Sequence, residues 1–188
     1  MRIIAGEFRG RTLLGPESDT TRPITDRAKQ SLFDVLAPLL DGAIVYDCFA
    51  GTGSMGLECL SRGAARARFF EADRSALQRL KRNVETFKVG PRADIIAGDL
   101  FKWFARQQNE VAENQRADLI FLDPPYRFLR EQRDALKTLA TQLLSHLKQS
   151  GVIVFRHDAN DSLVLPGLCE RDRRDYGSMT IELLQVEK

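Results

Sequence analysis

From about residue 43 onward, short apolar runs alternate with longer amphipathic stretches. The short runs are rich in β-branched and aromatic residues, which predicts strands at 43–49, 67–71, 93–97, 118–123, 151–156 and 179–186. The longer stretches predict helices at 54–62, 74–87, 100 to about 114, and 130–148. This alternation implies parallel strands joined by right-handed crossovers in a doubly wound α/β sheet, and Gly177 before the last run suggests a hairpin return.

The first 42 residues break this alternation. Two short runs, 2–6 and 11–14, flank a polar connection and suggest a basic hairpin or arm. An amphipathic helix follows, capped by Thr25 or Asp26. Its expected buried stripe is Leu32, Phe33, Val35 and Leu36.

Two compatible roles are open for this segment. The helix can cover one edge of the sheet, or it can roof a cofactor while Arg2, Arg9 and Arg11 contact RNA phosphates. We therefore expect an N-terminal basic arm with its covering helix at 1–42 and a catalytic domain at 43–188.

Composition narrows the class of protein. A chain of 188 residues with 43% hydrophobic content can bury one full core, and the net charge of +2 neither requires nor excludes a polyanionic partner. Three separated cysteines and two histidines argue against a zinc site or a disulfide framework. The charged start is unlike a secretory signal, and no apolar run is long enough for a membrane span, so we expect a cytoplasmic protein.

A glycine-rich turn follows the first strand of the alternating region, in the segment 47–56. Glycines let the backbone approach a ligand, and the helix that follows offers unpaired N–H groups. Gly51, Gly53 and Gly56 match the dinucleotide fingerprint, so a nicotinamide-dependent oxidoreductase is an alternative. The candidate cofactor-binding residues in this turn are Asp47, Phe49, Ala50, Gly51, Thr52 and Gly53.

Acidic residues at three strand ends favour S-adenosylmethionine. Asp47 would repel a diphosphate but suits the ammonium group of the methionine moiety, although it can also simply cap a turn. Glu71 can accept hydrogen bonds from both ribose hydroxyls of either cofactor. Asp99 can accept from the adenine amino group beside Leu100, or it can be a helix N-cap. All three acids lie where open α/β sheets bind their ligands.

The segment 119–126 carries the strongest chemical signal. Four apolar residues end in Asp123, Pro124, Pro125 and Tyr126, and the prolines make a rigid turn. The Asp123 side chain and the Pro124 carbonyl can accept both N–H bonds of an exocyclic amino group, which turns the nitrogen lone pair toward a sulfonium methyl group. Tyr126 can stack on the extruded base. We take these four residues as the candidate catalytic residues.

Other chemistries have weaker support. No cluster of metal ligands is present in the sequence, and Cys48 and Cys59 have no histidine in register. The turn also suits adenine in RNA or DNA and a protein glutamine, since each presents a planar, conjugated amino group. A non-catalytic RNA-binding module would not need the acid at the rigid turn.

Over nearly its whole length, the chain resembles the bacterial small-subunit (16S) ribosomal RNA guanine-N2 methyltransferases of the RsmD type. The matching segments are 2–6, 9–11, 21–23, 25–27, 47–53, 60–64, 123–126 and 176–177. The resemblance implies a Rossmann-like, seven-stranded sheet with a reversed last strand and S-adenosylmethionine as methyl donor. It also implies a guanine of small-subunit rRNA, free or in an assembling subunit, as acceptor. From the sequence itself we expect no metal and no membrane partner, because metal-ligand clusters and long apolar runs are lacking. Arg22 and Thr25 join the candidate cofactor-binding residues.

The chain departs from the family pattern at a few positions. Ile24 and the segment 28–30 differ from the expected Thr and Val-Arg-Glu types. Arg156 stands where the pattern usually has an acid after the fifth strand. These departures concern the identity of the target base more than the type of reaction.

Overall fold

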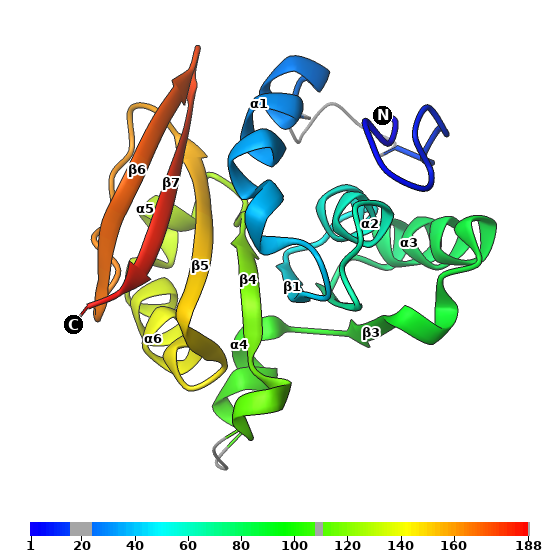
Figure 1. Ribbon diagram of the computed structural model, residues 1–188. Coiled ribbons are helices and arrows are strands. Elements are labelled where there is room, and N and C mark those ends of the chain that lie inside the picture. Colours follow the sequence, from blue (N-terminus) through cyan, green and yellow to red (C-terminus); the bar gives the residue numbers. More distant parts are fainter. Residues whose placement is uncertain (16–23, 108–110, 188) are drawn as a thin grey trace. The chain divides into compact units, whose positions relative to one another are not determined.

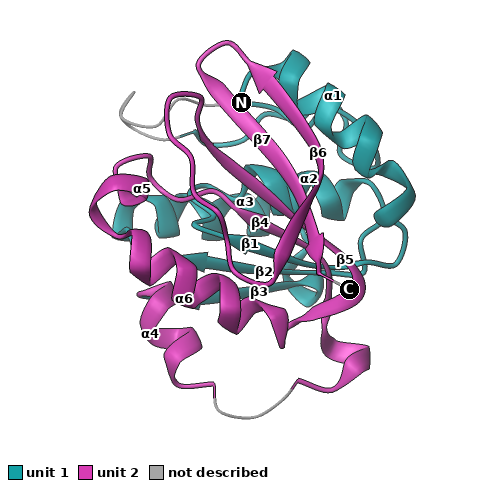
Figure 2. Cartoon of the chain, turned by 90° about the vertical axis from the view of Figure 1, so that its left-hand side faces the viewer, with its two compact units in different colours: residues 1–98 teal, residues 99–188 magenta. Residues whose placement is uncertain are grey.

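The computed structural model describes residues 1–15, 24–107 and 111–187. The chain forms two compact units, Met1–Gly98 and Asp99–Lys188 (Figure 2). The division at residues 42 and 43 was drawn from expected roles rather than from compactness, and it stays a prediction.

Within the described residues, the strands form a seven-stranded sheet with the order β3-β2-β1-β4-β5-β7-β6. The pairs β1–β2, β2–β3 and β4–β5 are parallel, while β7 is antiparallel to both β5 and β6. The predicted fold class, a mostly parallel α/β sheet with a reversed last strand, is therefore confirmed.

The first unit contains β1 (Ile44–Cys48), β2 (Arg66–Glu71) and β3 (Ala93–Ala97), close to the predicted ranges. Its helices are α1 (Asp26–Leu36), α2 (Ser54–Ser61) and α3 (Arg74–Phe87), with short 3₁₀ turns at Ala37–Leu39 and Gly90–Arg92 (Figure 1). The core of this unit includes the aromatic side chains of Phe33, Tyr46, Phe69 and Phe70, each at most 1% exposed.

The N-terminal segment is a small hairpin, as the sequence suggested. Ile3 donates to the Arg11 carbonyl at 3.0 Å, and Gly10 donates to the Ile3 carbonyl at 2.9 Å. Ile3, Phe8 and Leu13 are buried, so the hairpin is packed against the rest of the first unit. Burial of apolar side chains stabilises this packing, because it removes their surface from water.

Helix α1 begins after Thr25, whose side chain accepts from the Ala28 amide at 3.2 Å, so Thr25 rather than Asp26 is the cap. Three residues of the expected stripe are buried, but Val35 is only half-buried. Lys29, which the pattern did not mark, is 2% exposed. The buried face of the helix is therefore partly polar.

The second unit contains β4 (Ala117–Leu122), β5 (Leu147–Asp158), β6 (Leu168–Tyr176) and β7 (Met179–Val186). Its helices are α4 (Leu100–Ala105), α5 (Phe128–Glu131) and α6 (Arg133–Leu144), with a 3₁₀ turn at Glu113–Gln115. Strands β6 and β7 form the long hairpin drawn in orange and red in Figure 1. Its turn contains Gly177, as predicted.

Three sequence-based predictions about elements of this unit were wrong. The helix expected from 100 to about 114 ends at Ala105, because the apolar periodicity stops after Phe104. The helix expected at 130–148 is interrupted at Gln132, whose φ of −133° and ψ of 35° are not helical, and it ends at Leu144. Strand β5 accordingly starts earlier than expected, at Leu147.

In the part of the chain that the structure describes, no helix has both the length and the apolar character needed to cross a membrane. Among those same residues, no group of three or more His, Cys, Asp or Glu side chains is arranged to hold a metal ion.

Candidate cofactor site and active-site turn

The glycine-rich turn after β1 has an unusual backbone. Phe49, Gly51 and Gly53 have φ angles of +62°, +56° and +86°, in the left-handed region. For Phe49, a residue with a bulky side chain, this conformation costs on the order of 1–3 kcal/mol. The turn is held by the Ala50 amide, which donates to the Phe70 carbonyl at 2.9 Å, and by the Gly53 amide, which donates to the Ala50 carbonyl at 2.8 Å.

The glycines of this turn serve different purposes. A Cβ atom on Gly53 would lie 2.4 Å from Leu80 Cδ1, and one on Gly56 would lie 2.3 Å from Phe69 Cε1. These two glycines are therefore required for close packing around α2. A Cβ on Gly51 would meet nothing within 4 Å. Gly51 thus leaves open space beside the backbone, where a ligand could approach.

Asp47 is the acid that the sequence analysis assigned to the ammonium group of the cofactor. Its side chain is buried near the end of β1, with the residue 2% exposed. Its Oδ2 atom accepts from the Gly56 amide at 2.8 Å, in the first turn of α2. The carboxylate therefore binds the helix N-terminus directly, which satisfies one of the free amides there. Its role toward a cofactor stays a prediction.

Glu71 stands at the end of β2 beside the glycine turn. Its Oε2 atom accepts from the Gly51 amide at 2.6 Å, and its Oε1 atom accepts from the Asp73 amide at 2.7 Å. Burial raises the pKa of Glu71, and these backbone donors oppose that rise only in part. The Ala72 amide is a third backbone donor to this carboxylate. A carboxylate has roughly four acceptor positions, so these amides do not use all of them. Glu71 is thus held in place and can still accept hydrogen bonds from a ligand.

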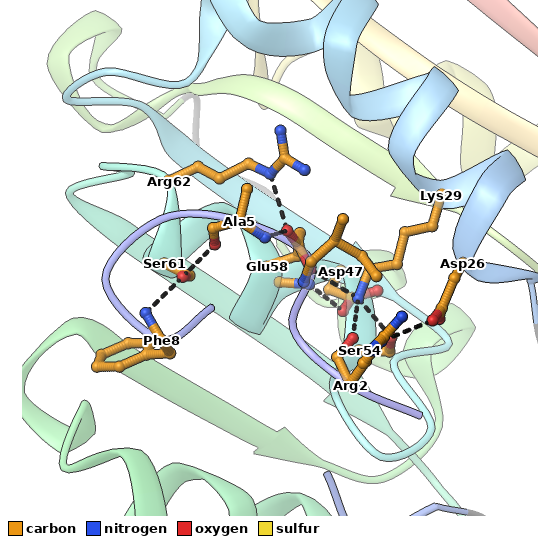
Figure 3. Close-up of polar contacts among 12 residues, drawn as sticks. Arg2, Ala5, Phe8, Asp26, Lys29, Asp47, Ser54, Glu58, Ser61 and Arg62 are labelled. Carbon is orange, nitrogen blue, oxygen red and sulfur yellow. Dashed lines mark hydrogen bonds and ion pairs between the residues drawn. The ribbon is translucent and has the colours of Figure 1, made fainter. Parts of the chain in front are cut away.

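A buried cluster centred on Glu58 connects the N-terminal hairpin, α1 and α2 (Figure 3). The Glu58 carboxylate accepts from the amides of Ile4 and Ala5 at 2.8 and 3.0 Å. It also pairs with Lys29 at 2.9 Å and with Arg62 at 2.8 Å. Burial raises the pKa of Glu58, but these cations and amides outweigh it, so the carboxyl stays ionised.

The same cluster reaches the start of α2, because the Lys29 ammonium donates to Ser54 Oγ at 3.1 Å. Asn83 provides a second connection: its amide nitrogen donates to the Thr52 carbonyl at 2.9 Å, and its oxygen accepts from the Leu14 amide at 2.9 Å. Through these two hydrogen bonds, Asn83 links Leu14 of the N-terminal segment to Thr52 of the glycine turn. Lys29, Glu58 and Asn83 were not predicted as functional residues from the sequence, although an isolated charge within an apolar helix such as α2 is the signal that marks Glu58.

The remaining cofactor candidates lie as follows. Asp99 caps α4, with its Oδ1 atom accepting from the Lys102 amide at 3.2 Å, and Leu100, the first residue of α4, is buried. The hydroxyl of Thr25 is engaged as the cap of α1. Arg22 lies outside the described residues. The cofactor roles of all these residues stay predictions.

The three arginines proposed to contact RNA differ in their surroundings. Arg2 pairs with Asp26 at 2.7 Å. Arg11 donates to the Thr86 carbonyl at 2.7 Å, and its guanidinium lies 4.5 Å from the centre of the Phe87 ring. Arg9 is exposed at the hairpin. Two of the three positive charges are therefore also held by contacts within the protein.

The candidate catalytic turn follows β4 in the second unit. Residues 119–122 are at most 1% exposed, and the chain then turns through Asp123, buried Pro124 and exposed Pro125 to half-buried Tyr126. The Pro125 carbonyl accepts from the Phe128 amide at 2.8 Å, which leads the chain into α5. Asp123 accepts from Arg156 Nε at 2.7 Å and pairs with Arg156 Nη2 at 2.5 Å. The sequence predicted Asp123 as a catalytic residue but did not predict its pairing with Arg156.

Burial raises the pKa values of Cys48 and Cys59 well above the ordinary value, mainly because each thiol is removed from solvent. A buried thiol of this kind is a poor nucleophile, since the reactive form is the thiolate. Covalent catalysis by these cysteines is therefore disfavoured, in agreement with the sequence analysis.

Comparison with known proteins gives a consistent result. The family model described as "Conserved hypothetical protein 95" matches residues 1–185. The ribosomal RNA small subunit methyltransferase D of Haemophilus influenzae is 36% identical over 168 residues, covering 88% of this chain and 83% of that protein. Its Escherichia coli K12 counterpart is 42% identical over 127 residues, covering 68% of this chain and 61% of that protein.

A solved Escherichia coli structure, titled as a candidate methyltransferase, has a TM-score of 0.83 and 32% identity to this chain. The similarity covers the whole of this chain and 98% of that one. The family model spans nearly the whole sequence, and the fold extends over the same length. The chain therefore belongs to the family described as conserved hypothetical protein 95, the RsmD family that its sequence resembles.

Proposed function

We propose that this protein transfers a methyl group from S-adenosylmethionine to the exocyclic N2 amino group of a guanine in small-subunit ribosomal RNA. The observation that carries the proposal is the rigid Asp-Pro-Pro-Tyr turn directly after a buried strand, in a chain of the RsmD family. The substrate is RNA, either free or in an assembling small subunit, and the protein would act in the cytoplasm, where that RNA is made.

The first unit offers residues that fit S-adenosylmethionine. Glu71 accepts from the Gly51 amide and keeps further acceptor capacity. The space beside Gly51 is open, since a Cβ atom added there would have no neighbour within 4 Å. An acceptor next to open space suits the ribose hydroxyls. The buried Asp47 carboxylate adds negative charge to the same turn, which disfavours a diphosphate and so disfavours a nicotinamide cofactor. When bound, the cofactor supplies an electrophilic methyl group whose bond to sulfur breaks as the bond to nitrogen forms.

The second unit offers residues that fit the acceptor base. Asp123 and the Pro124 carbonyl would accept the two N–H bonds of the amino group, so that the nitrogen lone pair is available for the methyl carbon. The nitrogen gains positive charge as the new bond forms, and a negative acceptor stabilises this state more than the ground state. The surplus proton then passes from the nitrogen to the Asp123 carboxylate or to water. Tyr126 would stack on the base and hold it in place.

Replacement of Asp123 tests this assignment. Asp123→Ala should lower turnover by about 10²–10³-fold, the range typical of removing one electrostatic interaction with a transition state. Cofactor affinity should remain at the parental value. Asp118→Ala is a matched control, because Asp118 lies near the start of the same strand and pairs with Lys148 at 2.7 Å. Parental methylation rates in Asp123→Ala would show that Asp123 is only a turn residue.

Asp123→Asn separates two contributions to catalysis. The amide oxygen still accepts a hydrogen bond but carries no negative charge. Substantial remaining activity would mean that orientation of the amino group dominates. Activity as low as that of the alanine variant would mean that charge stabilisation or proton acceptance dominates.

A further inference from the structure

Arg156 is a charged residue at the end of an apolar stretch. It lies in β5 directly after residues 152–155, each of which is at most 2% exposed. Its own side chain is 16% exposed. A charge this far removed from water is costly unless it is paired and hydrogen-bonded. Its partners therefore indicate why the chain keeps an arginine here.

The guanidinium of Arg156 binds both oxygens of Asp123. Its Nε atom lies 2.7 Å from Oδ1, and its Nη2 atom lies 2.5 Å from Oδ2. Its third nitrogen, Nη1, contacts the sulfur of Met179 at 3.7 Å. A two-point contact between planar groups fixes the plane of the carboxylate as well as its position, which a single contact cannot do. The Asp123 side chain is thereby held in one orientation.

A carboxylate has roughly four acceptor positions, and Arg156 occupies two of those of Asp123. The other two stay available for a substrate. The Asp123 side chain is 22% exposed, so part of it still faces solvent. An acceptor that is held rigidly needs no reorganisation when charge develops on the base nitrogen. The Arg156 contact therefore suits an acid that must orient an amino group.

We infer that Arg156 is a positioning residue for methyl transfer, acting through Asp123 rather than by touching the substrate. The inference rests on the proposed function of Asp123. It predicts that Arg156 determines how fast the bound base reacts and leaves cofactor affinity unchanged. It also predicts that the arginine matters only while residue 123 is an aspartate.

The first arm of the test replaces Arg156 by Met and by Lys in the full-length protein, with labelled S-adenosylmethionine and unmodified small subunits as substrates. Arg156→Met should lower kcat by about 10²-fold, as expected when a reacting group is displaced by about 1 Å. Arg156→Lys should restore part of this loss, because it keeps the charge but offers a single point of contact. Unfolding midpoints and cofactor affinity are measured for each variant.

Lys148→Met is the matched control. Lys148 is also on β5, and it pairs with Asp118 of β4 at 2.7 Å, near the opposite ends of the same two strands. This variant therefore removes a comparable ion pair without touching the turn. If the role of Arg156 were only structural, the two methionine variants would have the same kcat.

The second arm is a double-mutant cycle with Asp123→Asn. If Arg156 acts through Asp123, adding Arg156→Met to Asp123→Asn should lower kcat by about 3-fold or less, because contacting residues are strongly coupled. A further loss as large as that in the parent would overturn the inference. So would equal kcat values for Arg156→Met and Lys148→Met. A parental protein that methylates no RNA would instead overturn the proposed function, and the inference with it.

Discussion

Glu58→Gln tests the role of the buried cluster that anchors the N-terminal hairpin. The Glu58 carboxylate is fully buried and receives four donors, from the amides of Ile4 and Ala5, from Lys29 and from Arg62. Glutamine offers one acceptor oxygen, and its NH₂ group would face donors instead. Lys29, with a side chain 3% exposed, would lose its carboxylate partner. Breaking a buried pair in this way costs about 3–5 kcal/mol.

This loss is a large part of the total stability of a domain, which is typically about 5–15 kcal/mol. Urea unfolding measured by circular dichroism should therefore show a midpoint lower by about 1 M or more. Glu131→Gln is the control, because its partner Arg127 lies 3.8 Å away and both side chains are more than 60% exposed. Such a surface pair contributes about 0–1 kcal/mol.

A second variant identifies the cause of the loss. Adding Lys29→Met to Glu58→Gln removes the unpaired buried cation, so the double variant should be more stable than Glu58→Gln alone. Equal midpoints for Glu58→Gln and Glu131→Gln would refute the reasoning. The reasoning would also be refuted if the double variant lost as much free energy of unfolding as the Glu58→Gln and Lys29→Met single variants lose together.

Three further predictions concern pH and salt. Burial raises the pKa of Glu71 above 4.5, and protonation of the carboxylate removes acceptor capacity. Cofactor affinity measured by calorimetry should therefore fall in acidic buffer, where Glu71 becomes protonated. Unchanged affinity would contradict the role of Glu71 in binding the ribose. Burial lowers the pKa of His157, but Glu182 and the Asp158 carbonyl outweigh it and raise the value above 6.5. Its contribution to stability is thus present below pH 6.5 and is lost as pH rises through the folded pKa, and His157→Gln should flatten this slope in urea unfolding. Arg9→Ala should reduce the slope of RNA affinity against salt concentration by about 0.7–0.9 for each phosphate that the arginine neutralises, whereas an unchanged slope would leave the arm a structural role.

The parts of the fold that depend on local pattern could be predicted from the sequence. Strands β1 to β4 and β7 differ from their expected ranges by at most one residue at either end, because short runs rich in apolar and β-branched residues, bounded by turn residues, predict strands. The glycine turn was likewise recognisable, since its residues follow one another along the chain.

Strand β6 could not be assigned by the same means. Its segment, Leu168–Tyr176, is mostly charged and exposed, and the strand lies at one end of the strand order. An exposed edge strand can lack the apolar pattern by which buried strands are predicted, and its charged side chains discourage pairing with other chains. Its strand structure is set by pairing with β7, which is a tertiary contact.

Some residues of the candidate site could likewise be predicted from the sequence, and others could not. The candidate residues Glu71 and Asp123 were identified because strand ends mark the ligand edge of this class of sheet. The partner of Asp123 was not identified, since Arg156 is 33 positions away. The cluster around Glu58 was also missed, because its donors Ile4, Ala5 and Lys29 belong to the N-terminal hairpin and α1, far from Glu58 in the sequence. Ion pairs across such separations depend on packing, and no local pattern encodes them.

The proposed reaction is methylation of a guanine amino group in small-subunit RNA. It is tested most directly by incubating the purified protein with labelled S-adenosylmethionine and small subunits that lack the modification, followed by nucleoside analysis of the RNA. Label should appear in N2-methylguanosine, at a rate about 10²–10³-fold lower when the Asp123→Ala variant replaces the parent. Label in an adenosine or in a ribosomal protein, or no transfer at all by the folded parent, would contradict it.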